Sequence, residues 1–414
     1  FTRMRAAVGI WIVSVVICMG RGDHHFGHHQ GDQDTTFDSS TNSVSLVTSA
    51  NKQFAFRLYR KLAAQADSQS KNIFFSPVSV SVALAALSVG ARGETHLQLF
   101  SGLGFNNSVL TQRDVDQAFQ TLLQRENNTM DEDISEGTAV FLHNSFKPQP
   151  EFLETLKQSY FAEGFNVDFS ATDSINTINK YVEEKTNGKI NKLVENLEDN
   201  TVMYLISYIY YKGKWATQFN PELTMMDTFT VDENTKVDVQ MMNMEADFEI
   251  VNDQTINTIV LHLPFNNSYS MLLLLPEDMA TLENAISPDH VTKWLESKTP
   301  RSVHLYIPKF SIKTCYSLNE VLTQMGMSAM FGDHADFHGI SEREDLLVSE
   351  VVHQATLDVD EAGATAAAST GIGITVRSGS PTPTLKFNRP FMVIITERST
   401  EEILFTGKII NPKI

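Results

Sequence analysis

From Gly363 to Pro383 the chain reads Gly-Ala-Thr-Ala-Ala-Ala-Ser-Thr-Gly-Ile-Gly-Ile-Thr-Val-Arg-Ser-Gly-Ser-Pro-Thr-Pro. The run is long and made of small residues, and Arg377 is its only charged one. Strand-like runs flank it, Val351 to Asp360 before it and Phe391 to Thr396 after it. Long loops without secondary structure are uncommon in compact domains and are usually functional. This segment is therefore the first candidate for a functional loop.

Helical patterns dominate the first half of the chain. Phe54, Leu58 and Leu62 recur every fourth residue, which predicts an amphipathic helix and a folded part that begins near Lys52. Val78 to Val89 is apolar and uncharged, as in a helix buried on all sides. Further helices are predicted at 114–125, 150–163 and 172–196, the last with a break at Asn187-Gly188.

Strand patterns dominate the second half. Val202 to Tyr211 and Tyr269 to Leu275 are apolar runs bounded by turn residues, as in strands covered on both faces. Val303 to Ile312 alternates more, which indicates one half-exposed strand. Because the helices cluster early and the strands late, the sequence favours an α+β fold over a regularly alternating α/β fold.

The first residues resemble a secretory signal. Met4 and Arg5 precede an apolar run that ends at Met19 and is too short to span a bilayer comfortably, so we expect a signal peptide at 1–20. Residues 21–49 are polar and include four histidines. Their low hydrophobicity predicts a disordered tail, and we expect no metal site in it. Three Asn-x-Ser/Thr acceptors, Asn106, Asn127 and Asn266, then predict a secreted glycoprotein.

Composition excludes several classes of function. The chain has 414 residues, of which 42% are hydrophobic, so it can bury a large core. Its formal net charge of −18 argues against nucleic acid and anionic membranes as partners. The two cysteines, Cys18 and Cys315, rule out a disulfide framework, and we expect Cys315 to be a small buried hydrophobe.

Four motifs, in this order and at these separations, resemble the serpin family. They are Asn72-Ile-Phe-Phe-Ser-Pro77, Tyr211-Lys-Gly-Lys-Trp215, Leu385-Lys-Phe-Asn-Arg-Pro-Phe-Met-Val-Ile-Ile395 and Phe405-Thr-Gly-Lys-Ile-Ile-Asn-Pro412. The resemblance covers roughly residues 50–414 and is greatest to the α1-antitrypsin group of plasma serpins. It implies three β-sheets, eight or nine helices and an exposed reactive loop at about 362–384. It also implies a monomer without a cofactor that acts as a suicide inhibitor of serine proteases.

The loop composition suits insertion into a sheet. A central strand must bury alternate side chains, and charged ones there would cost several kcal/mol. The hinge that the resemblance assigns to Glu361 and the residues after it is free of charge from Gly363 to Thr370, and it contains Gly363, Ala364, Ala366, Ala367 and Ala368.

The resemblance also assigns residues that control opening of the main sheet. Glu361 matches the acidic residue at the loop base, Lys309 its salt-bridge partner, and Trp215 lies with them. Ser76, Ser79 and His353 match a polar cluster at the sheet centre. The family commonly has Asn on the neighbouring strand where this chain has Ser207, so the hydrogen-bond network must differ.

Two counts place the scissile bond. Counting from Glu361 as in the family gives Arg377-Ser378, whereas counting back from Phe387 gives Gly379. We favour Arg377-Ser378, because the length of the inserted strand is set from the hinge side. Arg377 is the only basic residue between Glu361 and Lys386, and trypsin-like proteases bind such a cation against a buried carboxylate.

Three other functions are weighed. A hydrolase is not expected, because the chain lacks Gly-x-Ser-x-Gly and His-Glu-x-x-His motifs. A hormone carrier that inhibits nothing is the stronger alternative, but non-inhibitory serpins often carry bulky or charged hinge residues, which Ala364 to Thr370 do not include. Heparin activation is not expected, since Val109 to Arg125 contains only Arg113 and Arg125 as bases.

Overall fold

The computed structural model describes residues 35–65, 70–128, 134–198, 200–362 and 381–414, without the side chains of 35–41 and 126–128. Its helices are α1 (Thr35–Ala63), α2 (Pro77–Ser88), α3 (Gly93–Leu103), α4 (Gln112–Asn128), α5 (Pro150–Tyr160), α6 (Ser174–Lys185), α7 (Met279–Ala285), α8 (Pro288–Glu296) and α9 (Asn319–Gln324), with short 3₁₀ turns η2 (Pro221–Leu223) and η3 (Ala329–Phe331).

The strands are β1 (Ile73–Phe75), β2 (Ile134–His143), β3 (Glu163–Val167), β4 (Met203–Tyr211), β5 (Met225–Thr230), β6 (Lys236–Asp253), β7 (Thr258–Pro264), β8 (Tyr269–Pro276), β9 (Thr299–Pro308), β10 (Phe310–Ser317), β11 (Glu350–Val359), β12 (Thr384–Lys386), β13 (Phe391–Glu397) and β14 (Ile403–Ile409). Helices come first along the chain and most strands later, in agreement with the predicted α+β class.

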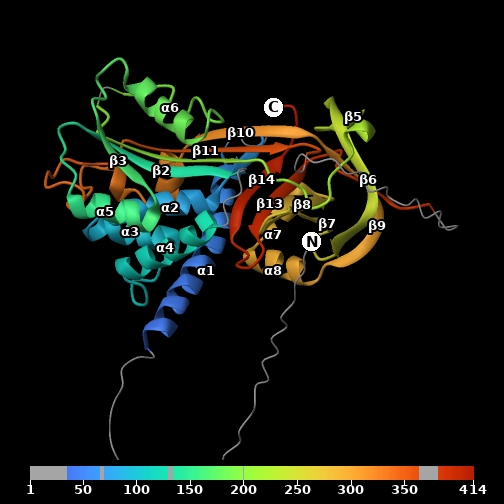
Figure 1. The fold of residues 1–414 in the computed structure, drawn as a ribbon, viewed down its shortest axis with the longest axis horizontal. Helices are drawn as coiled ribbons and strands as arrows, with labels where there is room; N and C mark the ends of the chain where they lie inside the picture. Colours follow the sequence, from blue (N-terminus) through green and yellow to red (C-terminus); the bar gives the residue numbers. More distant parts are fainter. Residues whose placement is uncertain (1–34, 66–69, 129–133, 199, 363–380) are drawn as a thin grey trace, which may run out of the picture.

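A five-stranded sheet in the order β10-β11-β4-β2-β3 runs along the molecule. Helix α2 lies against one face of it and α6 against the other (Figure 1). Within this sheet β11 and β4 are parallel neighbours, with His353 opposite Ser207. The parallel pair lies between strands that pair with it in antiparallel fashion, β10 on one side and β2 on the other.

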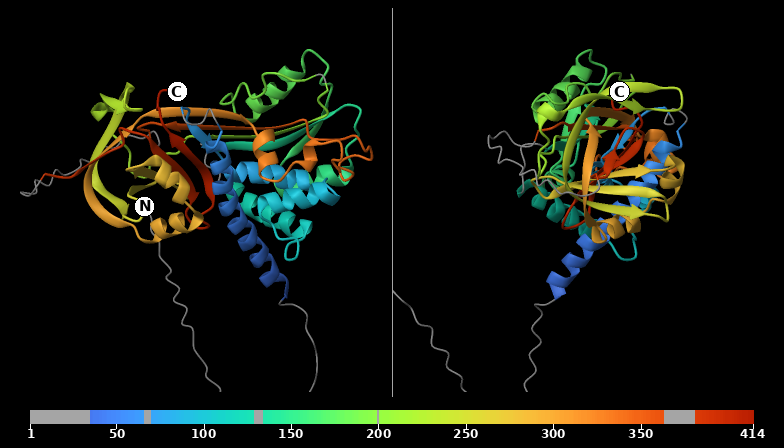
Figure 2. Two further views of the ribbon diagram at one scale, coloured as in Figure 1. Left: turned by 180° about the vertical axis from the view of Figure 1, so that it is seen from behind. Right: turned by 90° about the vertical axis from the view of Figure 1, so that its right-hand side faces the viewer.

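The second sheet has nine strands and turns around the other end of the molecule (Figure 2). Its long strand β6 belongs to two parts. Residues Met241 to Ile250 pair with β9, which carries β12, whereas Glu249 to Asp253 pair with β7 and lead to β8, β13, β14 and β1. Divided at β6, the two parts and the five-stranded sheet make up the three predicted sheets.

Helix α2 is the centre of the helical layer. Every residue from Pro77 to Ser88 is buried, as the uncharged sequence predicts. Its start is fixed twice, because Pro77 suits the first helical position and the Ser76 hydroxyl accepts a hydrogen bond from the Ser79 N–H at 3.2 Å. Strands β4 and β8 are buried along their whole length, also as predicted.

The predicted start of the folded part is wrong by more than one helical turn. Helix α1 begins at Thr35, inside the segment predicted as a disordered tail. Val44, Val47, Thr48 and Asn51 follow the helical spacing, and Val47 is fully buried. The serine- and threonine-rich sequence hid this face because these residues are weak helix formers.

Two predicted elements are divided differently in the structure. The predicted helix 172–196 ends at Lys185, since Asn187 and Gly188 both take positive φ values, and residues 186–198 continue without a helix. The predicted strand 303–312 is two strands in two sheets, because Pro308 has no N–H to continue the ladder and the chain crosses over at Lys309.

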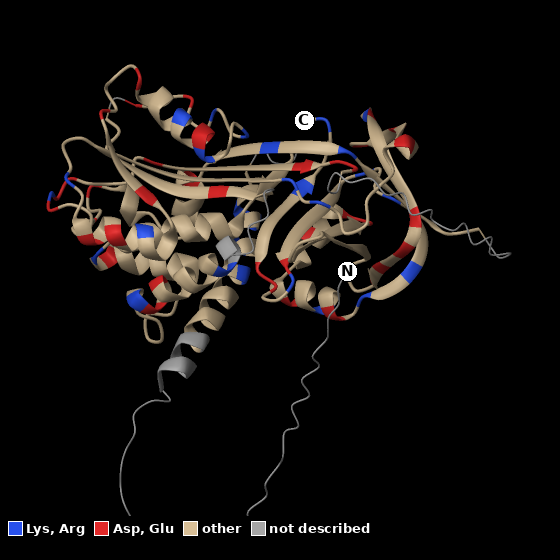
Figure 3. Cartoon of the chain, viewed as in Figure 1, with Lys and Arg blue, Asp and Glu red and all other residues tan. Residues whose placement is uncertain are grey.

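In the part of the chain that the structure describes, no helix combines the length and apolar character needed to cross a membrane. Acidic and basic positions are interspersed over this part (Figure 3).

Candidate functional site

The end of β11 is held by an ion pair. Glu361, two residues beyond the strand, accepts from the Lys309 ammonium at 2.8 Å and from the Thr224 hydroxyl at 2.7 Å. Its side chain is nearly buried. Burial alone would raise the pKa of Glu361, but the hydrogen bonds from Lys309 and Thr224 outweigh it and hold the pKa below its usual value. Glu361 is therefore a carboxylate at neutral pH.

Trp215 holds the residue before it. The indole N–H of Trp215 donates to the Asp360 carbonyl at 2.9 Å, and its ring stacks on Phe265 with centroids 4.7 Å apart. The Asp360 carboxylate pairs with Lys212 at 2.7 Å. The structure thus brings Glu361, Lys309 and Trp215 together where β11 ends.

A second polar group lies at the centre of the five-stranded sheet. The Nε2 atom of His353 accepts from the Ser76 N–H at 3.0 Å, and its Nδ1 atom lies 3.0 Å from the Ser207 hydroxyl. The Ser76 and Ser79 hydroxyls are 2.9 Å apart. His353 therefore connects β11 to β4 on one side and to the start of α2 on the other.

The His353 ring is neutral. It is fully buried, and this desolvation lowers its pKa to about 3. Because Nε2 accepts from a backbone N–H, the ring proton resides on Nδ1 and is donated to Ser207. The Ser207 hydroxyl thus completes the hydrogen-bond network of the ring.

Sequence reasoning missed two members of these groups. The Ser79 hydroxyl donates to Glu136 on β2 at 3.3 Å, beside a cavity of about 70 Å³ that both residues line. Thr224 at the loop base is the second missed residue. Neither has a local signal, because one stands in a strand that the sequence pattern did not reveal and the other in a polar turn.

The reactive bond Arg377-Ser378 and the hinge residues Gly363, Ala364, Ala366, Ala367 and Ala368 lie outside the described residues. The predicted glycosylation residues Asn106 and Asn266 are exposed on turns, whereas the side chain of Asn127 is outside the description.

The expectation that Cys315 is a buried hydrophobe is wrong. The residue is exposed on β10, and its sulfur lies 3.6 Å from the Leu193 carbonyl oxygen. Adjacent residues nevertheless shield the sulfur from water, and this desolvation raises the pKa of the thiol to about 11. The thiol is therefore protonated and weakly nucleophilic at neutral pH.

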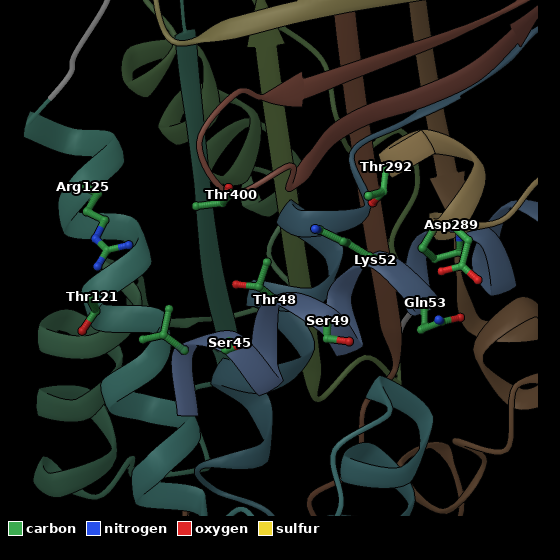
Figure 4. Close-up of a pocket in the computed structure, with 12 residues that line it drawn as sticks. Ser45, Thr48, Ser49, Lys52, Gln53, Thr121, Arg125, Asp289, Thr292 and Thr400 are labelled. Carbon is green, nitrogen blue, oxygen red and sulfur yellow. The ribbon is translucent and has the colours of Figure 1, made fainter. Parts of the chain in front are cut away.

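A larger pocket lies away from the loop base, between α1, α4, α8 and the turn before β14. Several residues with hydroxyl groups line it, namely Ser45, Thr48, Ser49, Thr121, Thr292 and Thr400 (Figure 4). The volume is about 660 Å³, and no aromatic side chain is among the described residues that line it. Lys52 at its edge pairs with Glu401 at 3.3 Å.

Comparison with known proteins identifies the family. The model of the family "Serpin (serine protease inhibitor)" matches residues 49–412. The chain is 40% identical over 386 residues to Serpin A3-5 of Bos taurus, covering 92% of each chain. It is 40% identical over 369 residues to alpha-1-antiproteinase of Callosciurus caniceps, covering 87% of each. The chain belongs to the serpin family.

Solved structures agree with this assignment. Human thyroxine-binding globulin complexed with thyroxine matches with a TM-score of 0.83 and 35% identity, covering 90% of this chain and 100% of the other. Human glycosylated kallistatin matches with a TM-score of 0.82 and 35% identity, covering 90% and 99%. The predicted family and fold are thus confirmed.

Proposed function

We propose that this serpin is a secreted inhibitor that traps trypsin-like serine proteases as covalent acyl complexes. The observation that carries the proposal is the parallel pair of β11 and β4 in the middle of the five-stranded sheet. The chain leaves β11 at Val359, so a strand returning between β11 and β4 would be antiparallel to both. Two antiparallel ladders would replace one parallel ladder, which is slightly less stable per residue.

The covalent step uses the protease's own chemistry. Its active serine hydroxyl attacks the carbonyl carbon of Arg377, the peptide bond to Ser378 breaks, and the new amino group of Ser378 takes the proton. The protease is then held as an ester on Arg377. The loop segment before Arg377 begins with small, uncharged residues after Gly363, so this segment can enter the sheet without burying a charge. We propose that the chain itself catalyses no reaction.

Opening of the sheet breaks contacts that the described residues make. The hydrogen bond between His353 and Ser207 joins β11 to β4, the two strands that must separate to admit the new strand. At the loop base, the contacts of Glu361 with Lys309 and Thr224 hold the end of β11 where the strand must turn. We assign these residues, with Trp215, Ser76 and Ser79, to control of sheet opening.

The partners and compartment follow from the same proposal. Exposure of Asn106 and Asn266 supports glycosylation during secretion. The net charge of −18 disfavours nucleic acid and anionic membranes, and α4 carries too few bases for heparin activation. We propose a monomer that needs no cofactor.

A carrier function is the alternative. Two observations favour it: the likeness to thyroxine-binding globulin and a pocket of about 660 Å³, large enough for a hormone. Against it, the hydroxyl-rich pocket without aromatic side chains differs from typical sites for apolar ligands. Equilibrium dialysis against thyroxine and cortisol tests it directly.

The deciding experiment is incubation with trypsin. We expect a complex that survives boiling in detergent, and mass spectrometry should find a C-terminal peptide that begins at Ser378. Arg377→Ala should form no such complex with trypsin, because the pocket of the protease loses its cation. Clean cleavage of the wild-type loop without any complex would favour the carrier instead.

A further inference from the structure

A carboxyl group is buried where two helices meet the turn before β14. Glu402 is only 5% exposed, although acidic side chains usually lie at the surface. The Asn51 amide on α1 donates to Glu402 Oε1 at 2.8 Å and accepts from the Ser81 hydroxyl on α2 at 2.6 Å. Among the described residues, no other group donates a hydrogen bond to the carboxyl oxygens of Glu402. Glu402 is thus joined to α1 directly and to α2 through Asn51.

The charges around Glu402 do not neutralise it. Lys52 on α1 is the cation that acts on it, but the Lys52 ammonium already pairs with Glu401 at 3.3 Å. Glu397 at the end of β13 and Glu136 on β2 add negative charge, and α2 carries no charged residue. An ionised Glu402 would therefore be poorly compensated in this position.

Burial decides the protonation state of the group. Desolvation raises the pKa of Glu402 to about 7, and it outweighs the hydrogen bond from Asn51 and the charge of Lys52, which both lower the pKa. The carboxyl group is therefore neutral in mildly acidic solution and loses its proton around neutral pH.

Space for a response to ionisation lies next to the group. The pocket of about 660 Å³ borders the same turn at Thr400 and the same helix at Thr48 and Lys52 (Figure 4). Ionisation with the turn in place would leave a charge in the core. Movement of the turn toward the pocket would let water reach the carboxylate of Glu402, while it would break the contact with Asn51.

We propose that Glu402 is a proton-dependent latch. With a neutral carboxyl group it holds α1, α2 and the turn before β14 together, and ionisation of the group loosens this junction. Helix α2 begins beside Ser76 and carries Ser79, so the latch acts on the helix whose start contacts the centre of the five-stranded sheet. The proton dependence does not rest on the proposed function, because every contact in the latch belongs to the native chain alone.

The test compares Glu402→Gln with wild type in urea unfolding at several pH values. Because the pKa of Glu402 rises from 4.5 to about 7 on folding, the native protein keeps a proton that the unfolded chain has lost, and its stability falls as the pH rises through this window. We expect the unfolding constant of the wild type to increase, relative to that of Glu402→Gln, by up to about tenfold per pH unit within the window and to level off above it.

A matched control and two further measurements accompany this comparison. Glu401→Gln removes an equal charge one position earlier and should keep the wild-type dependence on pH. Hydrogen exchange at residues 399–404 and 48–52 should be faster in wild type than in Glu402→Gln at about pH 8, and equal in the two proteins at about pH 5. Asn51→Ala removes the hydrogen bond that favours the carboxylate, so it should move the window of the wild type to higher pH.

Three results would overturn the latch. Parallel stability curves for Glu402→Gln and wild type would show that Glu402 is not the titrating group. Equal hydrogen exchange of the two proteins at both pH values would show that ionisation does not loosen the junction. A window that moves to lower pH in Asn51→Ala would contradict the role assigned to the Asn51 hydrogen bond, and this variant tests the latch even if Glu402→Gln does not fold.

Discussion

His353 joins three elements through one ring. It lies on β11, donates to Ser207 on β4 and accepts from the backbone at the start of α2. The contact with the Ser76 N–H requires the neutral ring, since protonation would place a second N–H against this donor. The protonation of this fully buried ring therefore links the stability of the protein to pH.

The first prediction concerns this ring. Its pKa is about 3 in the folded protein, below the usual 6.5, so the stability it contributes is present above about pH 6.5 and is lost as the pH falls toward 3. His353→Gln should be less stable at pH 7.5 because its amide fits the network less well. Its stability should depend less on pH, by up to about 1.4 kcal/mol per pH unit within that window.

Urea unfolding at pH 7.5, 6, 5 and 4 measures this difference. His262 has a pKa of about 4 and titrates in the same range, but it is present in both proteins and cancels in the comparison. Parallel curves for variant and wild type would show that His353 is not the titrating group.

The two faces of strand β11 differ in how well their buried polar side chains are hydrogen-bonded. The face with His353 packs toward α2, whereas the face with Gln354 and Thr356 lies toward α6 and the segment that follows it. Gln354 is fully buried, and neither atom of its amide group has a hydrogen-bond partner among the described residues. The buried Thr356 hydroxyl likewise has no hydrogen-bond partner among the described residues. Such groups lower the stability of the native state.

The second prediction follows for Gln354→Leu. The leucine side chain carries no polar atom, so the substitution removes the unpaired amide, and the native protein should gain about 1–3 kcal/mol against unfolding. The midpoint in urea measures it, with the exposed Gln324→Leu on α9 as control. A loss of stability in the Gln354 variant would show that the amide is paired after all.

The third prediction concerns the hinge. Ala364→Glu should leave the fold intact but turn the inhibitor into a substrate, because the inserting strand would have to bury a charge at a cost of several kcal/mol. Ser380→Glu is the matched control, since it lies beyond the proposed cut. Densitometry of detergent-resistant complex against cleaved protein gives the ratio. Full trapping by Ala364→Glu would place the hinge elsewhere.

Elements with uniform environments could be predicted from the sequence, and elements that change environment could not. Helix α2 and strands β4 and β8 are buried throughout, so their apolar runs identified them. Strand β6 alternates between buried and exposed stretches as it passes from one part of the sheet to the other, and no simple period marks it. At the site, motifs indicated His353 and Glu361, but Thr224 and Glu136 become neighbours only through folding.

At the level of the whole molecule, the proposed mechanism requires the native state to be less stable than the cleaved one. Cutting the loop frees it to add a strand between β11 and β4, so the fourth prediction is a sharp rise in melting temperature after cleavage at Arg377. Scanning calorimetry of intact and trypsin-cleaved protein measures it. Arg377→Ala treated in the same way should show no rise. A cleaved wild type that melts at the temperature of the intact form would contradict the insertion mechanism.

One long-range contact has a consequence for biosynthesis. The Asn72 side chain accepts a hydrogen bond from the Ile410 N–H, 338 positions later, and β1 pairs along its length with β14. At about 5–20 residues per second, roughly 20–70 s separate the synthesis of these two partners on the ribosome. Throughout that interval Phe74 and Phe75, both buried in the finished protein, have no strand to pair with. The yield of this protein in a cell should therefore depend on chaperones that cover the nascent chain until β14 emerges.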